Sequence, residues 1–209
     1  EESSDHIANA ASRINKLYAN VITSLATENL NKLKKNEKNV SKLNRDIDDL
    51  KDGVFYFIKS LEEDSVEASK FYIMTLGYLQ DIAQSIGFIA RASYRHVNNN
   101  HKALKKGQIK DLLGVEKELE ELLQEVNTIF SERSFDELEK IIKEKQELLK
   151  DVSLSIEKQV ARIREEETSP KNTTLYFSIL LETQDLVTAI MNLLELYQEF
   201  YLSTKQLDK

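Results

Sequence analysis

The chain has 209 residues, enough for one substantial domain or two small ones, and its lack of cysteine excludes disulfides, thiolate metal sites and cysteine nucleophiles. A formal net charge of -7 disfavours general nucleic-acid binding, because phosphate contacts need clustered Lys and Arg. One Pro and five Gly among abundant Leu, Lys, Glu and Ile predict long helices.

The first two predicted helices are marked by apolar stripes. Residues spaced alternately by three and four run from Ile7 to Leu25 and indicate one amphipathic helix. A second stripe from Leu33 to Leu61 predicts a rod of about 30 residues, roughly 45 Å at 1.5 Å per residue.

A third helix and a polar connection complete the first half. Asp64 followed by Glu67 has the spacing of a capping box, and the apolar pattern then continues to about Val97. The polar segment 98–108 that follows contains Gly107, so we expect it to connect two halves of the chain.

The pattern then starts again. A shorter helix is predicted over 109–130, and Ser134 with Glu137 predicts a capping box that opens a rod to about Arg164. Ser169 followed by Pro170 is typical of a helix start, and this last helix is expected to end near Leu202.

An internal repeat relates the two halves at an offset of 104 residues. The third and sixth predicted helices align without a gap, so that Gln80 and Asp81 match Gln184 and Asp185. Further pairs at this offset are Glu62/Glu166, Glu63/Glu167, Ser65/Ser169, Tyr72/Tyr176, Leu76/Leu180 and Ile86/Ile190. Helical periodicity alone would match apolar residues but not the polar ones, so we infer a tandem duplication.

The expected fold is all-α, with six helices in two tandem antiparallel three-helix bundles. We divide the chain into a first bundle (1–99), a linker (100–108) and a second bundle (109–209), which together form one domain. The third and sixth helices are apolar around much of their circumference, so they either pack against each other or build a homodimer surface. No apolar run approaches the roughly 20 residues of a membrane span, and we expect a soluble piece of a larger protein.

Two long stretches resemble a known family. They read FYIMTLGYLQDIAQSIGFIARASYRHVNNNHKALKKGQIKDL and RIREEETSPKNTTLYFSILLETQDLVTAIMNLLELYQEFY. Together with the duplicated three-helix unit, they resemble the PhoU-like cytoplasmic domain of bacterial, Bacteroides-type sodium/phosphate cotransporters.

The resemblance implies a non-catalytic regulatory or interaction domain at the cytoplasmic face of the inner membrane. Its expected partners are the transmembrane part of the same transporter or the membrane surface, with a homodimer as a further expectation. The alternative is a stand-alone metal-binding regulator of phosphate signalling, of PhoU type. A purely structural bundle or a ferritin-like enzyme is a weaker alternative, because the Glu-x-x-His pairs of di-iron bundles do not occur.

Many PhoU proteins are associated with iron or zinc clusters on a Glu–Asp motif spaced by four residues. Alignment on this motif places Gln80 and Gln84, and Gln184 and Thr188, where that family has its acids. Neutral amides and hydroxyls bind such cations more weakly than carboxylates do, so we expect no metal cofactor.

Four aspartates are weak candidates for a metal or ion contact. Asp81 and Asp185 occupy matching places in largely apolar helices, where a buried carboxylate needs a partner, and a structural hydrogen bond is the favoured reading. Asp46 and Asp49 belong to an acidic cluster on the second helix, for which a solvated face is the simpler explanation.

A local positive patch is the expected interaction surface. No acidic residue lies between Asp81 and Asp111, whereas basic residues accumulate there. The interaction candidates are Arg91, Arg95, His96, Lys102, Lys105 and Lys106. They suit anionic lipid, phosphate or a transporter loop, but a solvated helix end whose cations complement the helix dipole explains them about equally well.

Overall fold

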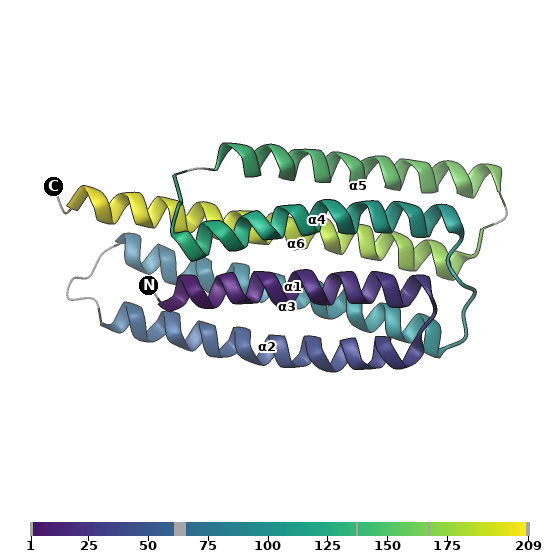
Figure 1. Ribbon diagram of the computed structural model, residues 1–209, viewed down its shortest axis with the longest axis horizontal. Helices are drawn as coiled ribbons and strands as arrows, with labels where there is room; N and C mark the ends of the chain where they lie inside the picture. Colours follow the sequence, from purple (N-terminus) through teal and green to yellow (C-terminus); the bar gives the residue numbers. More distant parts are fainter. Residues whose placement is uncertain (1, 61–65, 137, 167, 208–209) are drawn as a thin grey trace.

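The computed structural model describes residues 2–60, 66–136, 138–166 and 168–207. In these residues the secondary structure is helical, and the predicted all-α class with six helices is confirmed. The helices are α1 (Glu2–Ala26), α2 (Leu30–Lys59), α3 (Val66–Asn98), α4 (Lys106–Glu132), α5 (Glu139–Glu165) and α6 (Pro170–Leu207). Figure 1 shows them running lengthwise, with the chain reversing direction at each connection.

The starts of the helices test the predicted caps. Ser169 caps α6 as expected, since its hydroxyl accepts from the backbone N–H of Asn172 at 3.3 Å and Pro170 is the first helical residue. The Ser134 cap is wrong. Arg133 adopts a left-handed conformation (φ 54°) that ends α4, and α5 begins only at Glu139. The predicted caps Asp64 and Glu137 lie outside the described residues.

The connection between the halves is shorter than predicted. α3 ends at Asn98 and α4 begins at Lys106, three residues before the predicted Ile109. Gln108 fixes this early start, because its side-chain oxygen accepts from the backbone N–H of Lys105 at 3.0 Å. The division into bundles 1–99 and 109–209 with a linker stays a prediction.

The two halves pack with matching sets of contacts. α1 contacts α2 and α3 in the first half, and α4 contacts α5 and α6 in the second. Between the halves, equivalent helices meet: α1 packs on α4 and α3 packs on α6. Since each of these pairs is antiparallel (Figure 1), the arrangement is that expected for two repeats related by an approximate twofold axis.

The core is continuous across both halves. Its fully buried side chains include Tyr18 and Val21 of α1, Ile86 of α3, and Leu119 and Leu122 of α4. Of the two arrangements left open for the third and sixth helices, the structure shows the packing of α3 against α6.

α6 is unusually apolar. Over Pro170–Ser203 it is long and apolar enough to cross a membrane by length and composition, which differs from the expectation that no segment comes near this limit. However, 56% of its most apolar window is buried by the other helices. A helix covered on several sides is apolar for that reason, so this is weak evidence for a span.

One buried hydrogen bond joins the halves directly. The Tyr18 hydroxyl lies 2.7 Å from Thr183 Oγ1, and the Thr183 hydroxyl is also 2.6 Å from the carbonyl of Ile179. Thr183 has one proton, which it donates to that carbonyl, so Tyr18 is the donor to Thr183. Burial raises the pKa of the Tyr18 phenol and keeps it protonated.

Removing the acceptor Thr183 and removing the donor Tyr18 should therefore lower the stability by different amounts. Thr183→Val leaves the Tyr18 hydroxyl buried without an acceptor and should lower the free energy of unfolding by about 1–3 kcal/mol. Tyr18→Phe removes only the donor and should cost about 0.5–1.5 kcal/mol. Urea denaturation measures both, with the exposed Thr128→Val as the control, for which a change within about 0.5 kcal/mol is expected. A larger loss in Tyr18→Phe than in Thr183→Val would contradict the assignment of the donor.

Candidate functional site

Asp81 and Asp185 line one groove between α3 and α6. The groove has a volume of about 510 Å³. Both aspartates are exposed, so the expectation that they are buried in the apolar helices is wrong. The physical reason is that α3 and α6 turn their apolar surfaces toward their neighbours and keep polar residues along the groove, where these carboxylates reach solvent and bind no partner among the described residues.

The lining of this groove follows the repeat. At the offset of 104, Asp81 matches Asp185, Gln84 matches Thr188, Ser85 matches Ala189 and Phe88 matches Asn192, and all of these residues line the groove. Because α3 and α6 are antiparallel, the groove lies where the two repeats meet. Arg91 and Glu182 line it as well and have no counterparts in it, so its charge is not symmetric.

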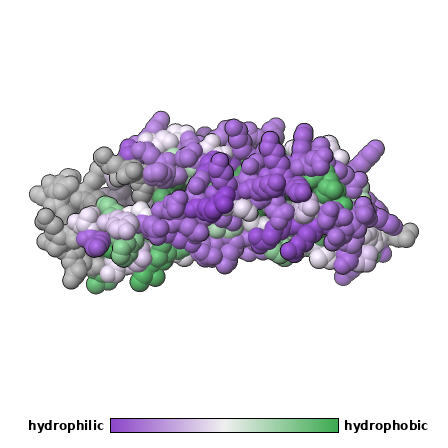
Figure 2. All heavy atoms as spheres, turned by 90° about the horizontal axis from the view of Figure 1, so that it is seen from below, coloured by the Kyte–Doolittle hydropathy of each residue, from purple (hydrophilic) through white to green (hydrophobic). Residues whose placement is uncertain are grey.

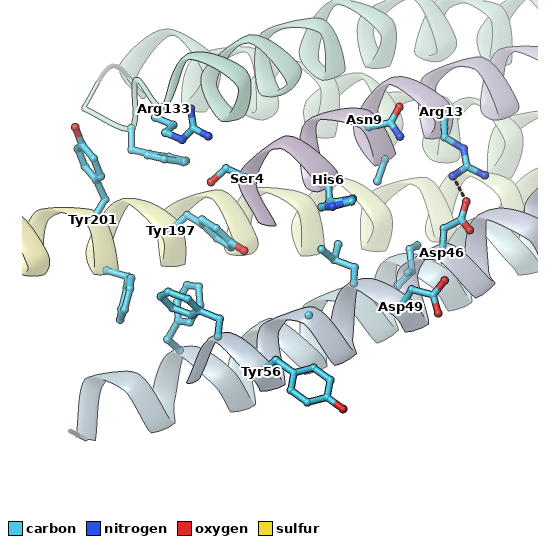
Figure 3. Close-up of a pocket in the computed structure, with 18 of the residues that line it drawn as sticks. Ser4, His6, Asn9, Arg13, Asp46, Asp49, Tyr56, Arg133, Tyr197 and Tyr201 are labelled. Carbon is cyan, nitrogen blue, oxygen red and sulfur yellow. Dashed lines mark hydrogen bonds and ion pairs between the residues drawn. The ribbon is translucent and has the colours of Figure 1, made fainter. Parts of the chain in front are cut away.

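Asp46 and Asp49 line a different, larger groove. This groove has a volume of about 1060 Å³ and lies between α1, α2 and α6 (Figure 3). Both aspartates are exposed, and Asp46 forms an ion pair with Arg13 of α1. The structure thus separates the two pairs of candidate aspartates, and Asp46 and Asp49 do not add ligands to the α3/α6 groove.

The larger groove is aromatic at its other end, and we call it the aromatic groove. Phe71 of α3 stacks on Phe200 of α6 with a ring separation of 4.4 Å and lies 5.0 Å from Tyr197. Phe135, from the connection after α4, packs 5.5 Å from Tyr201. We did not predict this site from the sequence. The only signals were the VFYF and YQEFY runs near the ends of α2 and α6.

The cationic candidates lie at the opposite end of the molecule. This is the end where α3 finishes and α4 begins (Figure 1). Arg91 and Arg95 belong to the last turns of α3, Lys102 and Lys105 to the connection, and Lys106 to the start of α4, and all five are exposed. Lys105 also lies 3.8 Å from the Glu166 carboxylate. The structure thus brings these five predicted residues to one end of the bundle, which we call the cationic end.

His96 does not share this exposure. It is only 5% exposed, and its Nε2 lies 2.8 Å from the backbone carbonyl of Lys102. The expectation that His96 takes part in a surface contact is therefore corrected: it holds the connection against α3, because a buried imidazole needs a polar partner.

A polar network supports the cationic end from inside the second half. Arg162 Nη2 and the Tyr176 hydroxyl both donate to Asp111 Oδ2, at 2.9 and 2.8 Å. Burial and the adjacent Asp111 carboxylate raise the pKa of the Tyr176 phenol to about 12. Because these residues come from α4, α5 and α6, the network fixes the start of α4 relative to its neighbours.

Comparison with solved structures identifies the fold. PhoU from Pseudomonas aeruginosa superposes on the chain with a TM-score of 0.71, and the match covers 94% of each chain at 11% sequence identity. The chain has the PhoU fold. No protein-family model matches the sequence, and no curated protein does.

The residues of this PhoU fold do not fit an iron or zinc cluster. Asp81 and Asp185 are accompanied in their groove by Gln84 and Thr188, which are neutral, and by the Arg91 cation, which repels a metal ion. Within the described ranges, no three His, Cys, Asp or Glu side chains lie close enough together to hold a metal ion. We therefore derive no chemistry through such a cluster.

An acidic face between α4 and α5 was not predicted. Burial is the main cause that raises the pKa of Glu118 to about 8, and the adjacent Asp151 adds to it, with Glu121 and Glu147 contributing. The folded protein therefore binds a proton at this group of carboxylates at a higher pH than an isolated Glu would. The helical period places Glu118 beside Glu121 on α4, but only the packing of α5 against α4 brings Asp151 and Glu147 close to them.

The raised pKa of Glu118 predicts a pH-dependent stability. A carboxyl group with a higher pKa in the folded state stabilises the protein while it is protonated, and this contribution is lost as the pH rises from 4.5 through about 8. Glu118→Gln should therefore leave the stability near pH 4.5 unchanged and exceed the wild type increasingly up to pH 8.5. Thermal melts over this range measure the effect, with the exposed Glu157→Gln as the control. Parallel pH curves for wild type and Glu118→Gln would contradict it.

Proposed function

We propose that the chain is a cytosolic, non-catalytic regulatory domain of a sodium-dependent phosphate transporter. In this proposal it docks through the cationic end on the transmembrane part of the same transporter or on the adjacent inner membrane surface. The PhoU fold and the sequence stretches that resemble transporter-associated PhoU-like domains support it. The supporting fold match is structural, at 11% identity, so the transporter context rests on the resemblance of the sequence.

The observation that carries the proposal is the segregation of charge. A chain with a net charge of -7 concentrates exposed cations at one end, where Arg91, Arg95, Lys102 and Lys106 lie close along the chain. Each Lys or Arg near an anionic surface contributes about 1 kcal/mol of attraction. The Asp111 network fixes the start of α4, which carries Lys106, relative to α5 and α6.

Regulation requires a difference in affinity between states. A docked domain shifts the transporter only if it binds one of its conformations better than another. A rigid bundle with cations at one end suits this role, because a small movement of an anionic loop changes several charge–charge distances together.

Neutralising the cationic end tests the proposal. In the full transporter, the combined variant Arg91→Gln, Arg95→Gln, Lys102→Gln and Lys106→Gln should weaken docking by about tenfold or more, since four contacts of up to about 1 kcal/mol are lost. Phosphate uptake at low and high phosphate supply measures the regulatory effect. The matched control neutralises Lys59, Lys70, Lys143 and Lys150, which are exposed on α2, α3 and α5 away from this end.

Two results of these experiments decide whether the proposal holds. An open reading frame upstream of Glu1 that encodes membrane-spanning segments, together with altered uptake only in the cationic-end variant, supports it. Unchanged uptake and an unchanged response to phosphate supply in that variant would refute it.

The groove between α3 and α6 gives one observation in favour of the alternative, a stand-alone metal-binding regulator. It gathers Asp81, Glu182 and Asp185 from both halves. The neutral Gln84 and Thr188 and the cation Arg91 weigh against it. Elemental analysis of the purified protein should give iron and zinc well below one ion per chain; a stoichiometric metal that is lost in Asp81→Asn but kept in Asp46→Asn would favour the alternative instead.

A further inference from the structure

The aromatic groove takes no part in the proposed docking through the cationic end. It lies at the other end of the bundle, where α2 ends, α3 begins and α6 ends (Figures 1 and 3). Seen from below, Figure 2 shows exposed hydrophobic residues at this end, while the middle of the same face is largely hydrophilic. A concentrated apolar patch on an otherwise polar surface marks a place where another molecule binds.

The groove is elongated. Its floor along α2 extends from Leu43 to Phe57, which at 1.5 Å per residue is about 21 Å. Along α1 it extends from Ser4 to Arg13. A groove of this length that is lined by helices can hold a further helix of about four turns. The diameter of such a helix, about 10 Å, is the same as that of the helices in the bundle.

The two ends of the groove differ in chemistry. Tyr56 and Phe57 at one end are 66% and 40% exposed, and Phe55 beside them is 46% exposed. Toward the other end, Asp49 is an exposed carboxylate that has no ion-pair partner among the described residues, while Asp46 is already neutralised by Arg13. The groove therefore offers apolar contact along most of its length and a negative charge near one end, so its occupant is complementary if it is apolar on one face and carries a cation.

Gly53 lies between these two ends. It lines the groove inside α2, six residues before the end of the helix, where glycine costs about 1 kcal/mol relative to alanine, and a Cβ added there would meet no atom within 4 Å. Packing within the chain therefore does not require glycine. Its effect is to leave the floor of the groove open, so that an occupant can approach the α2 backbone closely.

We infer that the aromatic groove binds an amphipathic helix of a partner protein, with apolar side chains against the ring-lined end and a Lys or Arg beside Asp49. The helix lies over Gly53, and its apolar residues recur at the i, i+3 or i+4, and i+7 spacing of one helical face. This inference does not depend on the transporter proposal.

Charge favours this occupant over an anionic membrane surface, because Asp49 lines the groove as an exposed carboxylate and Asp52, three residues further along α2, is exposed as well. A second copy of the chain is the remaining alternative, and the measurement of self-association tests it.

Three synthetic peptides test the inference on the full chain. The first is a basic amphipathic peptide of about 16 residues, long enough for four turns, with Leu and Phe on one face and Lys on the other. The second has Glu in place of Lys, and the third has the composition of the first in scrambled order. Fluorescence anisotropy should show that the basic peptide binds at least about tenfold more tightly than either of the others.

Two variants of the chain locate the binding. Gly53→Leu fills the floor of the groove, where a Cβ meets no atom within 4 Å, and leucine favours helix more than glycine does. This variant should therefore fold at least as well as the wild type, and its affinity for the basic peptide should be lower by about tenfold or more. Gly77→Leu and Gly114→Leu are the matched controls, because these exposed helical glycines also have open space at Cβ but do not line the groove. Asp49→Lys should reverse the preference between the basic and acidic peptides, whereas Glu157→Lys on α5 should not.

Each other outcome overturns the inference. Equal binding of the three peptides, or an undiminished affinity in Gly53→Leu, would show that the groove is not a helix-binding site. Binding of phosphatidylcholine vesicles that is lost in Gly53→Leu, with no peptide binding, would assign the groove to lipid. Self-association in sedimentation that is lost in Gly53→Leu, again with no peptide binding, would assign it to a second copy.

Discussion

α3 and α6 carry apolar residues around more of their circumference than one neighbour can cover, so each must be packed from several sides. In α6, Ile179, Leu186 and Val187 have no exposed surface. The other helices of its own half cover part of it, and α3 covers more. Apolar burial contributes roughly 25 cal/mol per Å², so the packing of α3 against α6 is a major part of the free energy that holds the two halves together. Tyr18 and Thr183 add a directional contact across the same boundary.

The packing of α3 against α6 also determines where polar side chains can lie. An antiparallel contact between equivalent helices places equivalent residues on both sides of one axis, and the groove with Asp81 and Asp185 is the result. The two repeats have diverged at this place, since Phe88 faces the groove from α3 where α6 has Asn192. A symmetric fold thus surrounds an asymmetric groove that combines carboxylates, amides and one arginine.

The two ends of the bundle have different surfaces because the repeats differ in their polar residues. At one end, Asp111 accepts from Arg162 and Tyr176, and exposed cations surround the connection to α4. At the other end, aromatic residues of α2, α3 and α6 meet beside exposed aspartates. In the first half, Tyr72 is the repeat partner of Tyr176, yet it packs 6.2 Å from Phe55 instead of binding a carboxylate. Duplication produced the six-helix bundle, and later substitutions gave its two ends different surfaces.

Periodicity in the sequence determined the number of helices, most of their bounds, the repeat and the Ser169–Pro170 start of α6, because these depend on interactions between residues close along the chain. It could not determine that Asp81 and Asp185 are exposed, that His96 is buried, or that Ser134 follows a left-handed turn instead of capping α5. Those outcomes depend on which face of each helix its neighbours cover. The aromatic groove and the acidic face around Glu118 likewise exist only once distant helices pack together, since each is built from side chains that the sequence separates and the tertiary structure brings within contact.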